Sequence, residues 1–160
     1  MGRIAMDALT SGACNIALGL TALGAATDNC GNIAIGRSAL AASVNDADEN
    51  IAIGTVAMGG ADVSGAQNIA IGSTAMDALT SGACNIGLGT DALGALLSGT
   101  NNIAIGKTAL GATTDGANNV AIGVGALQTS DGDGDNNVAI GNTAMGGADV
   151  SGDRNIAKTN

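Results

Sequence analysis

The residues that could carry out chemistry in this chain are almost all carboxylates. The 160 residues include 14 Asp and Glu but no histidine, so Ser-His and Cys-His catalytic pairs and histidine metal sites are excluded. The carboxylates stand in turn-forming segments and do not converge on one position that could form a pocket. We therefore expect no enzymatic activity and no catalytic residue.

One acidic segment has a spacing suited to a metal ion. Asp131, Asp133 and Asp135 alternate with glycine, which would let carboxylate oxygens surround Ca²⁺, and Asp46 and Asp48 take equivalent positions earlier in the chain. The alternative is a solvated acidic turn, because the twelve-residue EF-hand pattern with its terminal glutamate is missing. We expect no firmly bound cofactor, with calcium at the first three aspartates as the one candidate.

Composition and charge exclude several kinds of partner. The chain has a net charge of −9, only five Lys and Arg, and no aromatic residue. It therefore offers neither a basic face for phosphates nor rings on which bases could stack, so we expect no binding of nucleic acid. Glycines interrupt the longest charge-free stretch, residues 8–27, so we expect no membrane insertion.

The dominant feature of the sequence is an internal repeat. The motif Asn-(Ile/Val)-(Ala/Gly)-(Ile/Leu)-Gly recurs every 17 or 18 residues, which predicts the same turn of backbone in each copy. Its first residues are Asn15, Asn32, Asn50, Asn68, Asn85, Asn102, Asn119, Asn137 and Asn155. We expect these side chains to form a hydrogen-bonded ladder between adjacent rungs. The alternative is that each asparagine only caps its own turn.

The residues after each asparagine predict a short strand followed by a corner. Large aliphatic residues stand one and three positions after the asparagine, so both share one face, which we expect to face the core. The glycine four positions after it predicts a corner, and the Ala-Leu or Ala-Met pair at positions seven and eight predicts a second arc. An example of the inward column is Ile71, so Ile71→Asp should unfold or split the rod.

The alternation of the strand would then turn the small residue at position two outward. We expect this stripe to pack against another chain, through Ala34, Ala52, Ala70, Ala104, Ala121 and Ala139. Two alternatives are packing against a neighbouring loop and ice binding, since flat arrays of Ala and Thr can order water. The Thr column six positions after the asparagine is too irregular to favour ice binding.

These patterns predict an all-β fold, a parallel β-solenoid of about nine rungs. At the usual strand spacing of ~4.8 Å, nine rungs would form a rod about 43 Å long. Residues 1–160 would form a single repeat domain without distinct caps. Open rung ends favour head-to-tail stacking into filaments, and the alternative is an excerpt of a longer fibre. Lys158, which we expect at a core column, would disturb such a joint.

The cysteines give no compartment. Cys14 and Cys84 share a column four rungs apart, roughly 19 Å at that rung spacing, which is too far for a disulfide. Cys30 lies one rung from Cys14 and could pair with it, and the alternative is that all three thiols are free.

The segments NNIAIGKTAL (residues 101–110) and NNVAIG (residues 118–123 and 136–141) resemble the head repeats of YadA-like trimeric autotransporter adhesins and similar repeats of bacteriophage tail fibres. The resemblance implies a left-handed, usually trimeric, parallel β-roll with the two large aliphatic residues of the motif in the core. The typical repeat of that family is shorter, near fourteen residues, and this chain shows neither a coiled-coil stalk nor a membrane anchor. We therefore expect a fibre fragment or subunit, not a complete autotransporter.

Together these features predict a structural or adhesive fibre module that associates with itself, as a trimer, a filament or both. A cell-surface receptor is a further candidate partner. We expect an extracellular, virion-surface or cell-surface location, although no signal peptide is visible in this chain. The alternative function is that of an ice-binding β-solenoid.

Overall fold

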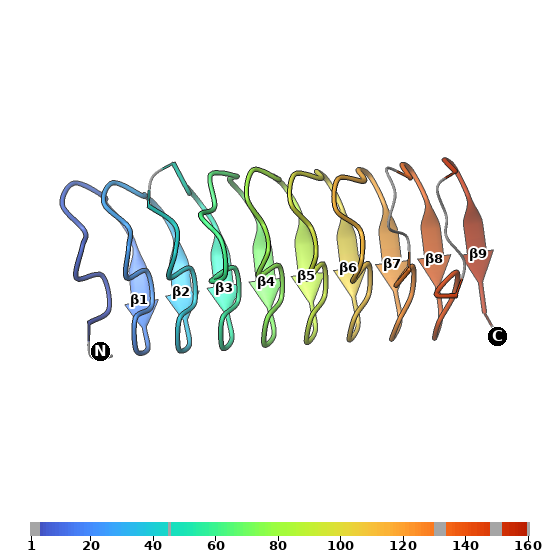
Figure 1. Cartoon of the computed structure of the whole chain (residues 1–160), viewed down its shortest axis with the longest axis horizontal. Coiled ribbons are helices and arrows are strands. Elements are labelled where there is room, and N and C mark those ends of the chain that lie inside the picture. The colour runs from blue at the N-terminus through green and yellow to red at the C-terminus, as the bar shows by residue number, and fades with distance from the viewer. Residues whose placement is uncertain (1–3, 45, 130–133, 148–151, 160) are drawn as a thin grey trace.

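A computed structural model shows a β-solenoid, and it describes residues 4–44, 46–129, 134–147 and 152–159. One strand lies in each rung, and the rungs follow one another along the long axis of the molecule (Figure 1). The strands are β1 (Ile16–Leu18), β2 (Ile33–Ile35), β3 (Ile51–Ile53), β4 (Ile69–Ile71), β5 (Ile86–Leu88), β6 (Ile103–Ile105), β7 (Val120–Ile122), β8 (Val138–Ile140) and β9 (Ile156–Lys158). The predicted all-β solenoid is therefore confirmed.

The nine strands form one parallel sheet in chain order, from β1 to β9. Each strand pairs with the next in the register of the repeat, so that Ile69 lies beside Ile86 and Ala70 beside Gly87. Residues that share a place in the motif consequently form straight columns along the rod. Within the described ranges, no helix is long and apolar enough to cross a membrane.

The side of the sheet that faces the core is opposite to the one predicted from the sequence. The middle residue of each strand points inward, and from β2 to β8 it is completely buried. The six alanines predicted to form an outward stripe are therefore interior: Ala34, Ala52, Ala70, Ala104, Ala121 and Ala139. The large aliphatic residues lie on the outer face instead, and Ile71 is 40% exposed. Lys158 is also exposed and stands in an outer column, not a core column.

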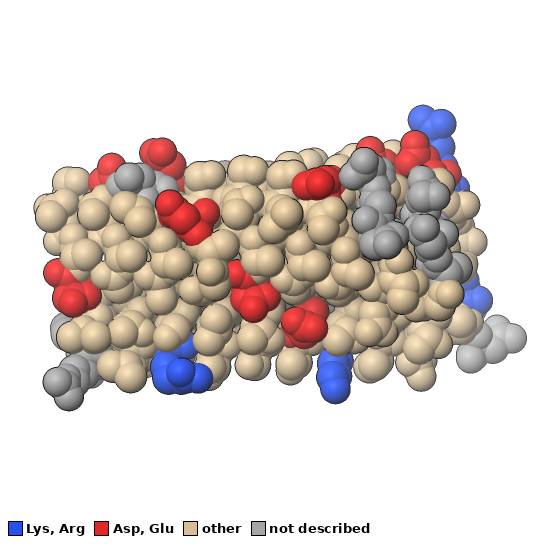
Figure 2. Space-filling model, viewed as in Figure 1, with Lys and Arg blue, Asp and Glu red and all other residues tan. Residues whose placement is uncertain are grey.

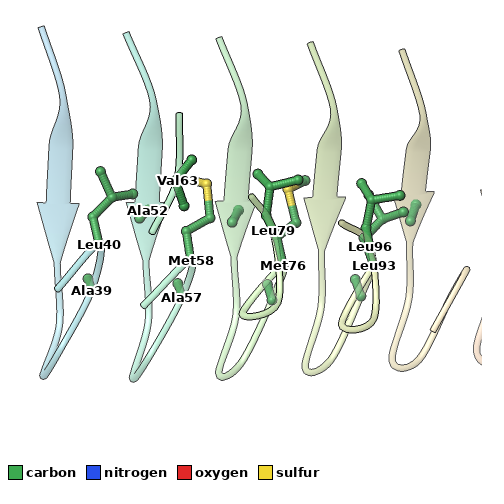
Figure 3. Packing of buried hydrophobic residues seen from close by; sticks show 14 of the residues in the cluster. Ala39, Leu40, Ala52, Ala57, Met58, Val63, Met76, Leu79, Leu93 and Leu96 are labelled. Atoms are coloured by element: carbon green, nitrogen blue, oxygen red, sulfur yellow. The ribbon is translucent and has the colours of Figure 1, made fainter. Parts of the chain in front are cut away.

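The narrow interior of the rung explains why the alanines face inward and the large aliphatic residues face outward. Large side chains from the arc opposite the sheet, such as Met58, Met76 and Leu93, cross the interior toward the strands (Figure 3). At Gly87, the middle residue of β5, an added Cβ would lie 3.0 Å from Met76 Cε. The interior therefore has room for no more than a methyl group on the inner side of each strand. An isoleucine at this position could be packed only if the arc on the opposite side of the rung moved away.

The second arc of each rung is a stacked turn and contains no strand in the described ranges. Its buried Leu or Met has a left-handed backbone, with φ of 51° at Met76 and 55° at Leu93. Backbone hydrogen bonds still run from rung to rung here, since the Leu93 amide donates to the Ala109 carbonyl at 3.0 Å. The identical conformation in successive rungs lets the turns stack and offsets part of the cost of the left-handed residues.

The glycine after each strand forms a corner that other residues fit poorly. From Gly19 to Gly141 this column has φ between 121° and 143°, a region that residues with a side chain rarely occupy. A Cβ added at Gly72 would collide with the carbonyl group of Gly89 in the next rung. The corner thus depends on glycine both for its backbone conformation and for the close approach of the rungs.

We predict that Gly72→Ala lowers the free energy of unfolding by at least about 2 kcal/mol, because strain and a backbone collision add together. Gly147→Ala is the matched control, since a Cβ at that glycine meets no atom within 4 Å. Thermal and urea unfolding followed by circular dichroism measure both effects. Equal melting temperatures for the two variants would contradict the close packing of the glycine corner.

Candidate functional site

The asparagines of the motif form a continuous column of hydrogen bonds. In every adjacent pair, the Oδ1 atom of one asparagine accepts a hydrogen bond from the backbone amide of the next, at 2.8–3.0 Å. The members are Asn15, Asn32, Asn50, Asn68, Asn85, Asn102, Asn119, Asn137 and Asn155. The structure therefore places them in the inter-rung ladder that the sequence predicts, and seven of them, Asn32 to Asn137, are buried.

The Nδ2 groups of Asn32, Asn68, Asn85 and Asn102 each join two further parts of the stack, whereas that of the buried Asn137 has no hydrogen-bond partner among the described residues. At Asn85 the Nδ2 group donates to Asn68 Oδ1 at 3.1 Å and to the carbonyl oxygen of Gly99 at 2.8 Å. Gly99 belongs to the turn that leads into the next asparagine, Asn102, whose amide donates to Asn85 Oδ1 at 2.9 Å. One side chain thus connects the preceding rung, the following rung and the following turn.

The surface with the clearest potential for binding is the outer face of the sheet. It consists of the first and third residues of strands β1–β9, and we call it the aliphatic face. Its exposed aliphatic members are Ile16, Leu18, Ile71, Ile105, Ile122, Ile140 and Ile156, between 37% and 81% exposed. Every position on this face is Ile, Val or Leu except Lys158. Its columns are straight because the strands are parallel and in register.

Apart from Lys158, the charged residues of the protein lie outside the aliphatic face. No Asp or Glu occupies a position of the aliphatic face, although the chain carries 14 of them. Figure 2 shows several Asp and Glu side chains, in red, on the side of the rod that it presents. An apolar face of this length is unusual for a monomeric soluble protein and is typical of an interaction surface.

The structure describes only one of the three aspartates predicted to bind calcium. Asp131 and Asp133 lie outside the described residues. Asp135 Oδ1 accepts a hydrogen bond from the Ala117 amide at 2.7 Å, and Asp48 Oδ1 accepts one from the Cys30 amide at the same distance. These two carboxylates therefore hold adjacent turns together. Among the described residues, no group of three Cys, Asp or Glu side chains is placed to hold a metal ion.

The remaining reactive groups do not assemble into a site. Cys14, Cys30 and Cys84 are free thiols, and Cys30 Sγ instead accepts a hydrogen bond from the Ala13 amide at 3.4 Å. No pocket opens in the part of the chain that the structure describes. The candidate functional features are therefore an extended ladder and an extended face.

Comparison of the chain with protein-family models, with curated proteins and with solved structures finds no match. The features that carry a functional interpretation are consequently those of the structure itself.

Asp77 is a carboxylate that the sequence did not single out. It is partly buried, and this burial raises its pKa, while the nearby carboxylate of Asp91 in the next rung raises the pKa further. Bonds from backbone amides partly oppose the rise. The sequence gives little indication of this pair, because Asp77 and Asp91 stand at different positions of the repeat. Their proximity becomes visible only in the structure.

We predict that Asn85→Ala lowers the free energy of unfolding by roughly 2–5 kcal/mol, because the buried Gly99 carbonyl and Asn102 amide lose their partner. Asn142→Ala is the control: this asparagine is exposed, outside the ladder, and we expect a change below about 0.5 kcal/mol. Urea unfolding at fixed protein concentration measures both. Near-equal stability of the two variants would show that the ladder contributes little.

We also predict that the contribution of Asp77 to stability rises as the pH falls from 7 toward about 4, the ordinary pKa of an aspartate. Since the pKa of Asp77 is raised by folding, the folded state binds its proton more tightly and gains stability on protonation. Asp77→Asn should raise the melting temperature at pH 7 and flatten this dependence.

The control for that change is Asp7→Asn, because residues 6–15 and 76–85 have the same sequence. Asp7 differs from Asp77 in being exposed, and the position equivalent to Asp91 in the next rung is occupied by the uncharged Thr21. It should leave the pH profile of melting closer to that of the parent protein. A profile equally flattened by both substitutions would contradict the assignment to Asp77.

Proposed function

We propose that the protein is a structural module of a fibre, a β-solenoid rod that associates with itself. The observation that carries this proposal is the aliphatic face, which runs along all nine strands and leaves large Ile, Val and Leu side chains open to solvent. An isolated rod would expose this surface to water at a cost that association removes.

The construction of the rod also supports a mechanical role. Successive rungs are connected by backbone hydrogen bonds in the sheet, such as Ile86 amide to Asn102 carbonyl at 2.8 Å, and by the asparagine ladder. These bonds run along the long axis, so extension of the rod would have to break several of them at each rung. A stack of this kind suits the display or spacing of other parts of a fibre at a surface, and adhesion would then use a receptor contact outside the aliphatic face.

Ice binding is the alternative function, but the alanine stripe on which it depended is buried. The hydroxyl groups of Thr74 and Thr108 donate to the carbonyls of the residues that precede them, Ser73 and Lys107, at 2.7 Å. Those hydroxyl protons are thus engaged within the chain, which weakens the case for a water-ordering surface.

We predict that the 160-residue chain forms assemblies of two or more copies at micromolar concentration. Analytical ultracentrifugation over a hundredfold concentration range, with electron microscopy of the same samples, measures their mass and shape. A chain that remains a monomer at the highest concentration would contradict the proposal. Thermal hysteresis measured on the same preparation tests the alternative, and its presence in a strictly monomeric sample would favour ice binding.

A further inference from the structure

We infer that the aliphatic face binds the aliphatic face of a second copy, with the two rods parallel. The inference rests on the proposed self-association and adds the surface and the orientation of the partner. Two other surfaces lack a comparable basis: the acidic turns are engaged by backbone amides, and the exposed thiols of Cys14 and Cys84 are isolated from metal-binding partners among the described residues.

The area of the face is sufficient for a stable contact between two copies. Its seven exposed aliphatic side chains leave roughly 600 Å² of apolar surface open, and the less exposed members add to it, against about 800 Å² per partner in a standard interface. A face that contains one lysine and no carboxylate could be buried without leaving many unpaired charges. Elsewhere the net negative charge of the chain opposes contact between copies.

A second copy also has the matching periodicity. Side chains on the aliphatic face repeat at each parallel strand, about 4.8 Å apart, and only a surface with the same repeat can fill the spaces between them along the whole rod. A globular partner could follow this repeat over a few rungs only. Identical columns on a second rod meet the requirement over all nine strands.

The charges at the two ends of the strands favour parallel rods. The column just after the corner glycine carries Arg37 and Lys107 as its only charges in the described residues, whereas the column just before the asparagine carries Glu49 and, six rungs further along, Arg154. In a parallel pair related by a twofold axis along the rods, strand ends of one copy lie against strand starts of the other. Arg37 of one copy then lies about one rung, along the rod, from the level of Glu49 of the other copy, so the two opposite charges attract each other. An antiparallel pair would instead set the basic column against itself.

The first test changes the face without changing the core. The variant Ile71→Lys with Ile105→Lys places charges in a column where the chain already has Lys158, so we expect it to fold. Its dissociation constant for self-association should rise on the order of tenfold or more relative to the parent chain. Leu97→Lys is the matched control, because Leu97 is 41% exposed, as Ile71 is 40% exposed, but lies in a loop outside the strands.

The second test measures orientation by crosslinking with a short bismaleimide. Cys84 lies before the asparagine of its rung and Thr90 lies after the strand, so Thr90→Cys adds a thiol at the opposite end of β5. With Cys14 and Cys30 replaced by serine, parallel copies should give covalent dimers linked from residue 84 to residue 90. Antiparallel copies would be linked between like residues, which mass spectrometry of the digested dimer distinguishes.

The outcomes separate this inference from the proposed function. A folded lysine variant that associates as strongly as the parent chain would overturn the aliphatic interface while leaving self-association intact. Crosslinks mainly between like residues would overturn the parallel arrangement. A parent chain that is monomeric throughout would remove both proposals. If the lysine variant does not fold, Ile71→Thr with Ile105→Thr retains β-branched residues, and undiminished association of that variant would count against the interface.

Discussion

Each rung depends on an asparagine whose side chain continues the hydrogen-bond ladder of the sheet beyond the start of a three-residue strand. The Oδ1 atom of Asn68 accepts the amide of Asn85 at 3.0 Å, and in return the Asn85 carbonyl accepts the amide of Ile69 at 2.8 Å. This reciprocal pair fixes the register at the point where the chain enters the strand. Rungs of 17 and 18 residues can therefore stack together, because the difference in length is absorbed in the loop that precedes the asparagine.

The loops that absorb the extra residue use their own side chains to stay attached. In three of the four 18-residue intervals an aspartate stands two positions before the asparagine, namely Asp48, Asp135 and Asp153. Each accepts a backbone amide from the preceding rung, at 2.7–2.9 Å. Part of the negative charge of the protein is thus structural, and the acidic pattern that suggests calcium in the sequence also satisfies backbone donors.

A thin core has a direct consequence for the surface. Because the Leu and Met side chains of the arc fill the interior, the strands can contribute only Ala or Gly to it, and their Ile, Val and Leu residues must lie outside. The same packing that stabilises the rung therefore creates the aliphatic face. Folding and association are linked through the width of the rung, since a wider rung could have buried these residues within one chain.

The repeat in the sequence was sufficient to predict the stacked parallel strands, the glycine corners and the asparagine column, because each depends on a fixed spacing. It was not sufficient to predict which side of the strand faces inward. Alternation shows that Ile69 and Ile71 share a side opposite to Ala70, but it does not show which side has the space. That answer depends on side chains such as Met76 that reach across from the other arc, which hydrophobicity alone does not reveal.

The most direct test of the asparagine ladder is hydrogen exchange resolved residue by residue by NMR. The backbone amides of Asn68, Asn85 and Asn102 should exchange as slowly as those of Ile86 and Ile103 in the sheet, and the side-chain amide protons of these asparagines should also be protected. Exchange of the asparagine amides at the rate of an unprotected loop, while the strand amides remain protected, would contradict the account.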